Sequence, residues 1–514
     1  MNLWNRKNTE RGIFMGNSIY EMIRGAVRAE GHLSENFRLP DDTADGQLKF
    51  APGAMDGILF YHTAGTESED SEGYTILVNA IESASEGRTD EAFCSVETFA
   101  AKYHVLGFID LFQEYVIENK DRLSVGNVID FAVRLMMEGI KVEAVKFGMS
   151  LLELIDWEGQ ERLKSAVRLL ALSDELTLYA AFLMRCWENP NRELFDILQK
   201  VEGWGRVHIV RMIEADSEDI EEWLVRNGVH NDVVPAYSGM DCFGKVHYLE
   251  RIRRPALDLE IYRGLADILD AMLDEGPVTG ISALEDPEEV MRAFLTAAKA
   301  RTDLEAQDYT PLIDLKGYME QTNQESPSGL YVELTDFLQS GQVQETMRSA
   351  LERKEAFEVA RRLGMDYQEY AFRAVTEDFV NNAWIASCLV ADGYKVEEII
   401  DLAYDRLDVE RIATGAGEEL GLGDAFEAHR ALTLILQELR NRVNVGEKLI
   451  RPALKSPVVS NRHMALSALE GWTEQSGQAL QELLPKMAGY LEGLLAEEVR
   501  EDLRQRMEQI LGKK

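Results

Sequence analysis

Three glycines near residue 415 have the spacing that comes closest to a cofactor-binding motif. Gly415, Gly417 and Gly421 form the pattern G-x-G-x-x-x-G. In a dinucleotide site such glycines follow a buried strand, so that backbone amides and the positive end of the next helix meet the pyrophosphate. The preceding segment, 396–412, is instead charged and has helical periodicity. We therefore interpret these glycines as helix-ending residues between two hairpins, and Gly203-Trp204-Gly205 is a weaker match.

The eight histidines do not have the spacing of metal ligands. None occurs in HxH, HxxxH or Glu-x-x-His, the patterns that place two ligands on one helical face for zinc or a carboxylate-bridged iron pair. His247 and Glu250 form a single i, i+3 pair, which is typical of an ordinary helix. Asp241-Cys242-Phe243-Gly244 contains residue types of a haem-thiolate loop but not their order. The sequence thus assigns no catalytic, cofactor-binding or metal-binding residue, and it holds no serine-hydrolase elbow, Walker lysine or kinase motif.

The cysteines and the apolar segments predict a cytoplasmic protein. Cys94, Cys186, Cys242 and Cys388 lie far apart, without a CxxC or a zinc pair, and we expect each to be a small core residue in a reducing compartment. The apolar stretch at 13–15 is too short for a signal peptide. No run reaches the roughly eighteen apolar residues of a membrane-spanning helix.

The charge balance excludes one class of partner. The chain has 514 residues, with 54 Lys and Arg against 91 Asp and Glu, and its formal charge is −37. A protein that binds nucleic acid by neutralising phosphates needs a basic face, and no strongly basic patch occurs here. We therefore expect neither a nucleic-acid nor a membrane partner.

Most of the sequence has the pattern of amphipathic helices joined by short turns. Ser124 is a plausible N-cap for a helix that ends at Gly139, where a glycine in the left-handed conformation would let the chain reverse. The next helix has apolar residues at intervals of three and four from Val142 to Ile155. Residues 138–145 align with 392–399 with four identities and two conservative pairs. The turn and helix start are therefore repeated, and Gly228 and Gly364 mark weaker versions of the stop.

These repeats predict an all-α protein: an irregular array of helix hairpins, a HEAT-like α-solenoid, with a less regular acidic N-terminal region. Ser456-Pro457 is expected to precede a helix that stops at Gly471-Trp472. The polar stretch 31–73 holds one apolar island, 57–62, that is either a short strand or a helix. Residues 321–329 form the best linker. The expected divisions are 1–87 as the irregular region, 88–325 as a helical-repeat region and 326–514 as a second one.

The tryptophans have two interpretations. They lie near predicted helix ends or on apolar stripes, where packing between hairpins is the usual role. Alternatively, some line a hydrophobic groove that holds an apolar ligand or a partner's helix, as arrays of helix pairs often do. The residues concerned are Trp187, Trp204, Trp223, Trp384 and Trp472.

Several segments resemble a known family. The opening, 1–8 with 16–25, and the stretch 203–208 leading to 222–228 resemble chains of Gram-positive bacteria identified as limonene hydroxylases, and the similarity extends over most of the length. The resemblance implies oxidation of the monocyclic monoterpene limonene to perillyl alcohol and carveol, with NAD(P)-linked dehydrogenation of these alcohols. It transfers no catalytic residue. A monooxygenase normally recruits flavin, haem or iron to activate dioxygen, and the sequence shows no motif for any of them.

Two functions from different classes follow. By resemblance, the chain is a cytoplasmic NAD(P)-dependent monoterpene monooxygenase and alcohol dehydrogenase that acts on a small apolar substrate. By its residue patterns, it is a non-catalytic α-helical-repeat scaffold for a protein partner, and the acidic excess favours a partner that is neutral or basic.

Overall fold

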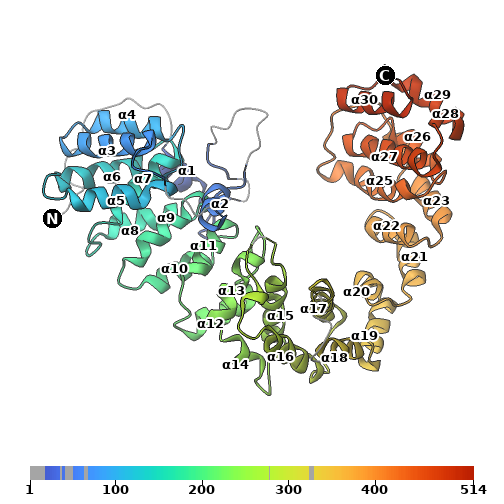
Figure 1. Ribbon diagram of the computed structural model, residues 1–514, viewed down its shortest axis with the longest axis horizontal. Helices are drawn as coiled ribbons and strands as arrows, with labels where there is room; N and C mark the ends of the chain where they lie inside the picture. The colour runs from blue at the N-terminus through green and yellow to red at the C-terminus, as the bar shows by residue number, and fades with distance from the viewer. Residues whose placement is uncertain are drawn as a thin grey trace. The chain divides into compact units, whose positions relative to one another are not determined.

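The computed structural model describes residues 18–34, 37–40, 50–62, 67–276, 278–322 and 329–513. Within these ranges the regular elements are all helices, α1 to α30 and five short 3-10 helices, and two isolated bridges are the only β contacts. The all-α prediction is therefore confirmed for the described residues. The chain divides into two compact units, Met1–Ala300 and Arg301–Lys514 (Figure 1). The divisions expected near residues 87 and 325 stay predictions.

In the first unit, helices that follow one another pack in pairs: α3 with α4, α6 with α7, α8 with α9, α10 with α11 and α12 with α13. The second helices also stack in order, α7 on α9, α9 on α11 and α11 on α13. They form one continuous layer, called here the second-helix layer. The helices are α1 (Ile19–Ala26), α2 (Ala54–His62), α3 (Glu72–Ser85), α4 (Thr89–Phe99), η1 (Val105–Phe108), α5 (Ile109–Glu118), α6 (Val125–Glu138), α7 (Val142–Leu152), α8 (Glu161–Leu170), α9 (Asp174–Arg185), α10 (Pro190–Leu198), α11 (Trp204–Met212), α12 (Glu218–Asn227), α13 (Ala236–Lys245), α14 (Tyr248–Ile252), α15 (Leu259–Leu273), η2 (Ile281–Ala283) and α16 (Pro287–Lys299).

The second unit continues the pairing, with α21 against α22, α22 against α25 and α25 against α27. Its α17 ends at Gln321 and α18 begins at Leu330, so the predicted linker does separate two helices, although its residues 323–328 lie outside the described part of the chain. The helices are η3 (Ala306–Tyr309), α17 (Thr310–Gln321), α18 (Leu330–Leu338), α19 (Gly341–Glu352), α20 (Phe357–Arg362), α21 (Gln368–Glu377), α22 (Ala383–Ala391), α23 (Val396–Arg406), α24 (Val409–Ile412), η4 (Asp424–Phe426), α25 (Glu427–Glu438), η5 (Leu439–Asn441), α26 (Glu447–Ala453), α27 (Val459–Ser476), α28 (Leu480–Leu483), α29 (Pro485–Leu494) and α30 (Glu501–Ile510).

Gly139 ends α6 as predicted, but for a different reason. Its φ is −56°, so the left-handed conformation expected from the sequence is wrong. A Cβ at this position would lie 2.6 Å from the carbonyl oxygen of Leu135 and 2.9 Å from a methyl group of Val145. Glycine is required here because two helices meet closely. At the aligned turn of the second unit, Gly393 does have a positive φ of 80°.

Gly471 does not stop α27, which continues to Ser476. A Cβ on Gly471 would lie 2.5 Å from both Cγ and the carbonyl oxygen of Arg440, so this glycine permits close packing of α27 against η5. The helix ends instead at Gly477, where φ is +66°. Gly471 therefore serves close packing between helices, and the predicted end of the helix at Gly471-Trp472 is wrong.

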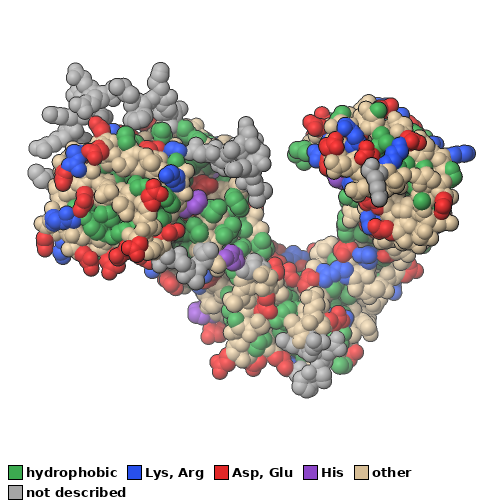
Figure 2. All heavy atoms as spheres, turned by 45° about the horizontal axis from the view of Figure 1, so that its top comes forward, with side chains coloured by type: hydrophobic (Ala, Val, Ile, Leu, Met, Phe, Trp, Pro, Cys, Tyr) green, Lys and Arg blue, Asp and Glu red, His purple; other side chains and the backbone are tan. Residues whose placement is uncertain are grey.

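Acidic side chains are spread over the face of both units that Figure 2 shows, in keeping with the net charge of −37. None of the helices in the described ranges is long and apolar enough to cross a lipid bilayer. Cys242 is buried, as expected, and Cys388 is half-buried, whereas Cys94 and Cys186 are exposed. The expectation of core thiols is wrong for these last two, which lie on the solvent side of α4 and at the end of α9.

Candidate functional site

Helix α2 lies on the second-helix layer of the first unit. The apolar island that the sequence left open as strand or helix is this helix. Its side chains contact α7 at Lys146, α9 at Tyr179, α11 at Trp204 and α13 at Tyr237. Figure 1 shows α2 beside α9 and α11. One short helix therefore spans the second helices of four consecutive pairs.

The contact is close because α2 presents a glycine to the layer. Gly57 is buried, and a Cβ built on it would lie 2.3 Å from a ring carbon of Trp204. The six-membered ring of Trp204 thus packs directly on the backbone of α2. A larger residue at position 57 would have to move either the helix or the buried indole.

A group of buried charges joins α2 to the layer. The Nζ of Lys146 lies 2.7 Å from Asp56 Oδ2, 2.7 Å from Glu143 Oε1 and 3.7 Å from Glu175 Oε2. The side chains of Lys146 and Asp56 are each only 2 % exposed. The hydroxyl of Tyr179 donates to Asp56 Oδ1 over 3.2 Å. Three carboxylates therefore surround one ammonium group, and only one of them comes from α2.

The electrostatics of this group favour binding rather than proton transfer. Burial alone would lower the pKa of Lys146, but the carboxylates of Asp56, Glu143 and Glu175 outweigh burial and raise it. Burial likewise opposes ionisation of Glu143, yet Lys146 and the hydrogen bond from His104 lower the pKa of that carboxyl to about 2. The pKa of Asp56 is raised by burial, which Lys146 only partly offsets. Lys146 is thus a charged clamp rather than a neutral nucleophile, and the ionised form of Asp56 is less stabilised than that of Glu143.

An aromatic cluster lies next to these charges. The ring of His208 stacks on Tyr61 at 6.1 Å and 21°, and it lies 5.8 Å from the rings of both Trp204 and Phe60. Tyr61 and Trp204 also pack on Tyr237, at 5.1 and 4.8 Å. Arg211 lies over Phe60 and Tyr61 at 5.4 and 5.2 Å, which is within the range of cation–π attraction. Aromatic rings from α2, α11 and α13 therefore meet in one cluster.

His208 is neutral in this cluster. His208 is fully buried, and neither of its ring nitrogens has a hydrogen-bond partner among the described residues. Burial, together with the positive charges of Arg211 and Lys146, lowers the pKa of His208 to about 3. The ring contributes apolar contact and carries no proton at neutral pH.

The buried His208 predicts a loss of stability in mild acid. In the unfolded chain the imidazole has a pKa near 6.5, whereas in the folded chain the pKa of His208 is about 3. Between these values the unfolded state binds more protons, so stability falls as the pH falls. Moving from pH 7.5 to 5.0 is expected to cost the wild-type chain about 2 kcal/mol more than a His208→Phe variant, measured by urea denaturation.

The comparison with His208→Phe is needed because the protonation of nearby carboxyls changes the stability in the opposite direction as the pH falls. Burial raises the pKa of Asp174 to about 6, against the hydrogen bond that it accepts from the Gly205 amide, so protonation of this group favours the folded state as the pH falls below 6. Asp56 acts in the same direction. Both groups are present in both chains and cancel in the difference. Equal losses of stability in the wild-type and His208→Phe chains would contradict the conclusion that His208 is buried as a neutral imidazole.

The segment that carries part of the family resemblance helps to form this site. The amide of Gly205 donates to Asp174 Oδ1 over 2.9 Å at the start of α11. A Cβ on Gly203 or Gly205 would lie 2.7 or 2.5 Å from the Asp174 carboxylate. These glycines therefore let Asp174 hold the first turn of α11, which in turn places Trp204 against α2.

The glycines near residue 415 lie in the second unit, in a segment that follows the short helix α24 rather than a strand. The amide of Gly415 donates to the carbonyl of Lys455 over 2.8 Å, and the carbonyl of Gly417 accepts from Arg462 over 2.6 Å. Since these backbone groups are already used within the protein, the segment does not fit a pyrophosphate cradle. Across the described ranges, no group of three or more His, Cys, Asp or Glu side chains is placed to hold a metal ion.

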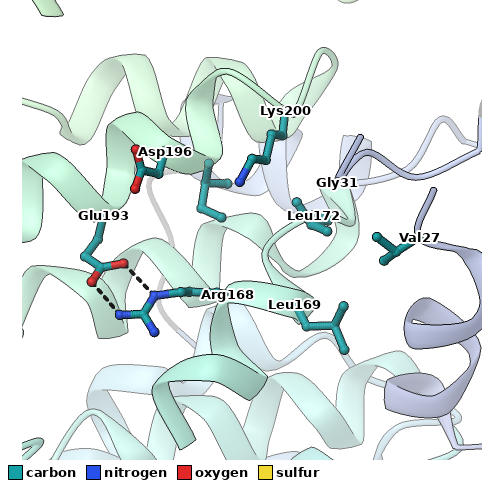
Figure 3. A pocket seen from close by; sticks show the side chains of 9 residues that line it. Val27, Gly31, Arg168, Leu169, Leu172, Glu193, Asp196 and Lys200 are labelled. Atoms are coloured by element: carbon teal, nitrogen blue, oxygen red, sulfur yellow. Dashed lines mark hydrogen bonds and ion pairs between the residues drawn. The ribbon is translucent and has the colours of Figure 1, made fainter. Parts of the chain in front are cut away.

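One pocket lies in the first unit and has a volume of about 310 Å³. Figure 3 shows Arg168 and Glu193 at its edge, joined by two hydrogen bonds of 2.7 and 2.5 Å. Because the guanidinium occupies both carboxylate oxygens, Glu193 is not available as a general acid or base. The other lining residues are Val27, Gly31, Leu169, Leu172, Asp196, Ile197 and Lys200.

A pocket of about 450 Å³ lies in the second unit. Its one carboxylate, Asp392, accepts from Arg361 over 3.3 Å and from the hydroxyl of Tyr367 over 2.8 Å. Burial, followed by this hydrogen bond, raises the pKa of Tyr367. Neither pocket combines unpaired groups in an arrangement suited to acid–base catalysis.

Sequence reasoning missed the charged part of the site. Asp56 and Lys146 are far apart in the chain, and no local pattern in the sequence pairs them. The available signal was Lys146 itself, which falls among Val142, Val145 and Met149 on an apolar stripe. A lysine in such a position needs a buried carboxylate as its partner.

No protein-family model matches this chain, and a search of the curated proteins finds no similar sequence. The resemblance to limonene hydroxylases therefore stays a prediction.

Proposed function

We propose that this chain is a scaffold of the α-solenoid type that binds a protein partner through its second-helix layer. The observation that carries the proposal is α2, which lies across the second helices of four pairs. Stacked helix pairs create extended surfaces, and an apolar helix laid into a groove is a common mode of peptide recognition. The layer already binds one helical segment of suitable chemistry, which belongs to the same chain.

The chemistry of the contact supports binding. Lys146 is a permanently charged clamp, His208 is a neutral ring and the aromatic residues offer flat apolar surface. Aromatic residues of this kind are typical of the energetically dominant centres of protein interfaces. The charge of −37 in turn favours a partner that is neutral or basic outside the contact.

Site-specific photocrosslinking tests this proposal. A photoreactive phenylalanine analogue at the exposed Arg211, on α11 beside α2, is expected to capture one protein at near-equal amounts. The matched control places the same probe at the exposed Arg192, on the first helix α10 of the same pair, where no such product is expected. The captured protein, once purified, should bind the full chain with 1:1 stoichiometry in calorimetry. Equal capture at both positions, or no binding by the purified candidate, would contradict the proposal.

Limonene oxidation is the second candidate. It is supported by the resemblance, and one part of the resembling sequence, Trp204 to His208, contributes to the aromatic cluster, whose rings suit an apolar monoterpene. Purified chain should then consume NAD(P)H only when limonene is present, and it should contain a flavin or haem absorbance or bound iron. A colourless, metal-free chain that produces neither perillyl alcohol nor carveol, also with the captured partner added, would remove this candidate.

A further inference from the structure

The second-helix layer supplies carboxylate partners for its buried lysine even without α2. Lys146 and Glu143 come from α7 and Glu175 comes from α9, so the ammonium keeps two carboxylate neighbours if α2 leaves. With α2 bound, Asp56 adds a third carboxylate to the same buried ammonium. Glu143 and Glu175 both act against the ionised form of Asp56. The contact that attaches α2 therefore adds a third negative charge around a single ammonium group that already has two carboxylate neighbours.

The aromatic side of the contact also contains a buried imidazole whose nitrogens make no hydrogen bond within the described part of the chain. Tyr61 and Phe60 of α2 cover His208, whose two ring nitrogens have no partner within the described residues. A buried polar group without a hydrogen bond destabilises the folded state. Once the His208 ring is uncovered, water can hydrogen-bond to its nitrogens and this cost is removed. The departure of α2 would therefore remove the added negative charge and would let water bind the unpaired imidazole.

The connections of α2 differ from those of the helix pairs. Residues 27–53 join α1 to α2 and residues 63–71 join α2 to α3, whereas only residues 139–141 join α6 to α7. Chain lengths of this kind let α2 separate without unwinding its neighbours. They also keep it at a high effective concentration beside the layer.

We propose that α2 is an internal occupant of the partner-binding surface and that the partner displaces it with a short apolar helix of the same kind. This inference rests on the proposed function and names its partner class. The partner helix carries a hydrogen-bond acceptor facing Lys146, a glycine next to it facing Trp204, and an aromatic ring four residues after the glycine stacked on His208. Asp56, Gly57 and Tyr61 hold these three places in α2.

A peptide competition measures the displacement. The probe is a fluorescent synthetic peptide with the sequence of residues 50–62, and binding is followed by anisotropy with full-length chain. Gly57→Ala in the chain weakens its own α2 through the Trp204 clash but leaves the layer unchanged. This variant is expected to bind the peptide at least tenfold more tightly than the wild-type chain, because internal occupancy lowers apparent affinity. The matched variant Gly126→Ala, in α6 with open space around its Cβ, should behave as wild type.

Peptide variants test the recognition features without affecting the fold of the chain. Peptides with Gly57→Ala, which clashes with Trp204, or Asp56→Lys, which places a second cation against Lys146, should bind the Gly57→Ala chain at least tenfold more weakly than the natural peptide. Equal binding of all three peptides, or equal binding of the natural peptide to the wild-type and Gly57→Ala chains, overturns the inference.

Hydrogen exchange on the wild-type chain gives a second measurement that needs no variant. The amides of α2 should exchange at least tenfold faster than those of α7, whereas equal protection would overturn displacement. The two proposals fail in different ways. Peptide discrimination without a crosslinked protein at Arg211 supports internal occupancy and contradicts the scaffold function. A crosslinked partner without peptide discrimination retains the scaffold function and overturns the inference about α2.

Discussion

Replacing Lys146 with methionine is expected to lower the free energy of unfolding of the first unit by about 3–5 kcal/mol. The substitution keeps much of the side-chain volume but removes the ammonium group that lies within 4 Å of all three carboxylates. Asp56 and Glu143 would then be left close together with no charge between them. Breaking a buried ion pair on one side is costly because the remaining charge has lost both water and its partner. Urea denaturation followed by tryptophan fluorescence measures the change.

The matched control is Lys102→Met. Lys102 is also a lysine beside a carboxylate, at 3.6 Å from Glu72, but both side chains are more than half exposed. Exposed pairs contribute about 0–1 kcal/mol, so the control should change little. Adding Asp56→Asn to Lys146→Met should restore part of the loss, since it removes one of the uncompensated charges. Similar effects of Lys146→Met and Lys102→Met would show that the buried charges do not stabilise the first unit.

Replacing Arg462 with methionine is expected to destabilise the second unit by a similar amount, about 3–5 kcal/mol. The Arg462 side chain is fully buried and its Nε donates to Glu498 over 2.9 Å, where the carboxylate is 1 % exposed. Two further donors of the same guanidinium bind the carbonyls of Ser456 and Gly417, both over 2.6 Å. The substitution leaves the Glu498 carboxyl buried without its guanidinium partner, and it leaves the carbonyl of Gly417 without this donor.

Lysine at position 462 should restore little of this stability, because an ammonium lacks the planar fork that reaches a carboxylate and two carbonyls at once. Arg348→Met is the control, since Arg348 pairs with Glu345 at 2.7 Å on an exposed face of α19. Thermal unfolding followed by circular dichroism checks the series. An Arg462→Lys chain as stable as wild type would mean that charge alone, rather than the guanidinium geometry, holds this segment.

The helices were the part of the fold that local sequence could predict. Helix α6 begins after Ser124 and ends at Gly139, where the sequence predicts, although the Ser124 side chain makes no capping hydrogen bond. The apolar stripe of α7 follows from the spacing of Val142, Val145 and Met149, because the faces of a helix depend on nearby residues. The roles of the glycines were less accessible. A Cβ on Gly139 would clash with the last turn of α6 and with Val145 of α7, and one on Gly471 would clash with Arg440 of η5. The spacing of residues in the sequence shows only that the helical pattern is interrupted.

The candidate site was harder to predict because its parts come from distant positions. The island at 57–62 was recognised as apolar, but Asp56 at its edge gained meaning only once α2 was placed against Lys146. His208 showed no ligand spacing, and its burial results from packing among Phe60, Tyr61 and Trp204. Long-range packing of this kind leaves no periodic trace in one sequence.

The three carboxylates around Lys146 also constrain how this chain can evolve. Loss of the lysine alone leaves buried carboxylates without a cation, and loss of the carboxylates alone leaves a buried ammonium without an anion. A chain that has undergone only one of these changes is therefore poorly folded. Homologous chains that have lost the charge at position 146 should therefore also carry neutral residues at positions 56 and 143, and these positions should covary as a set.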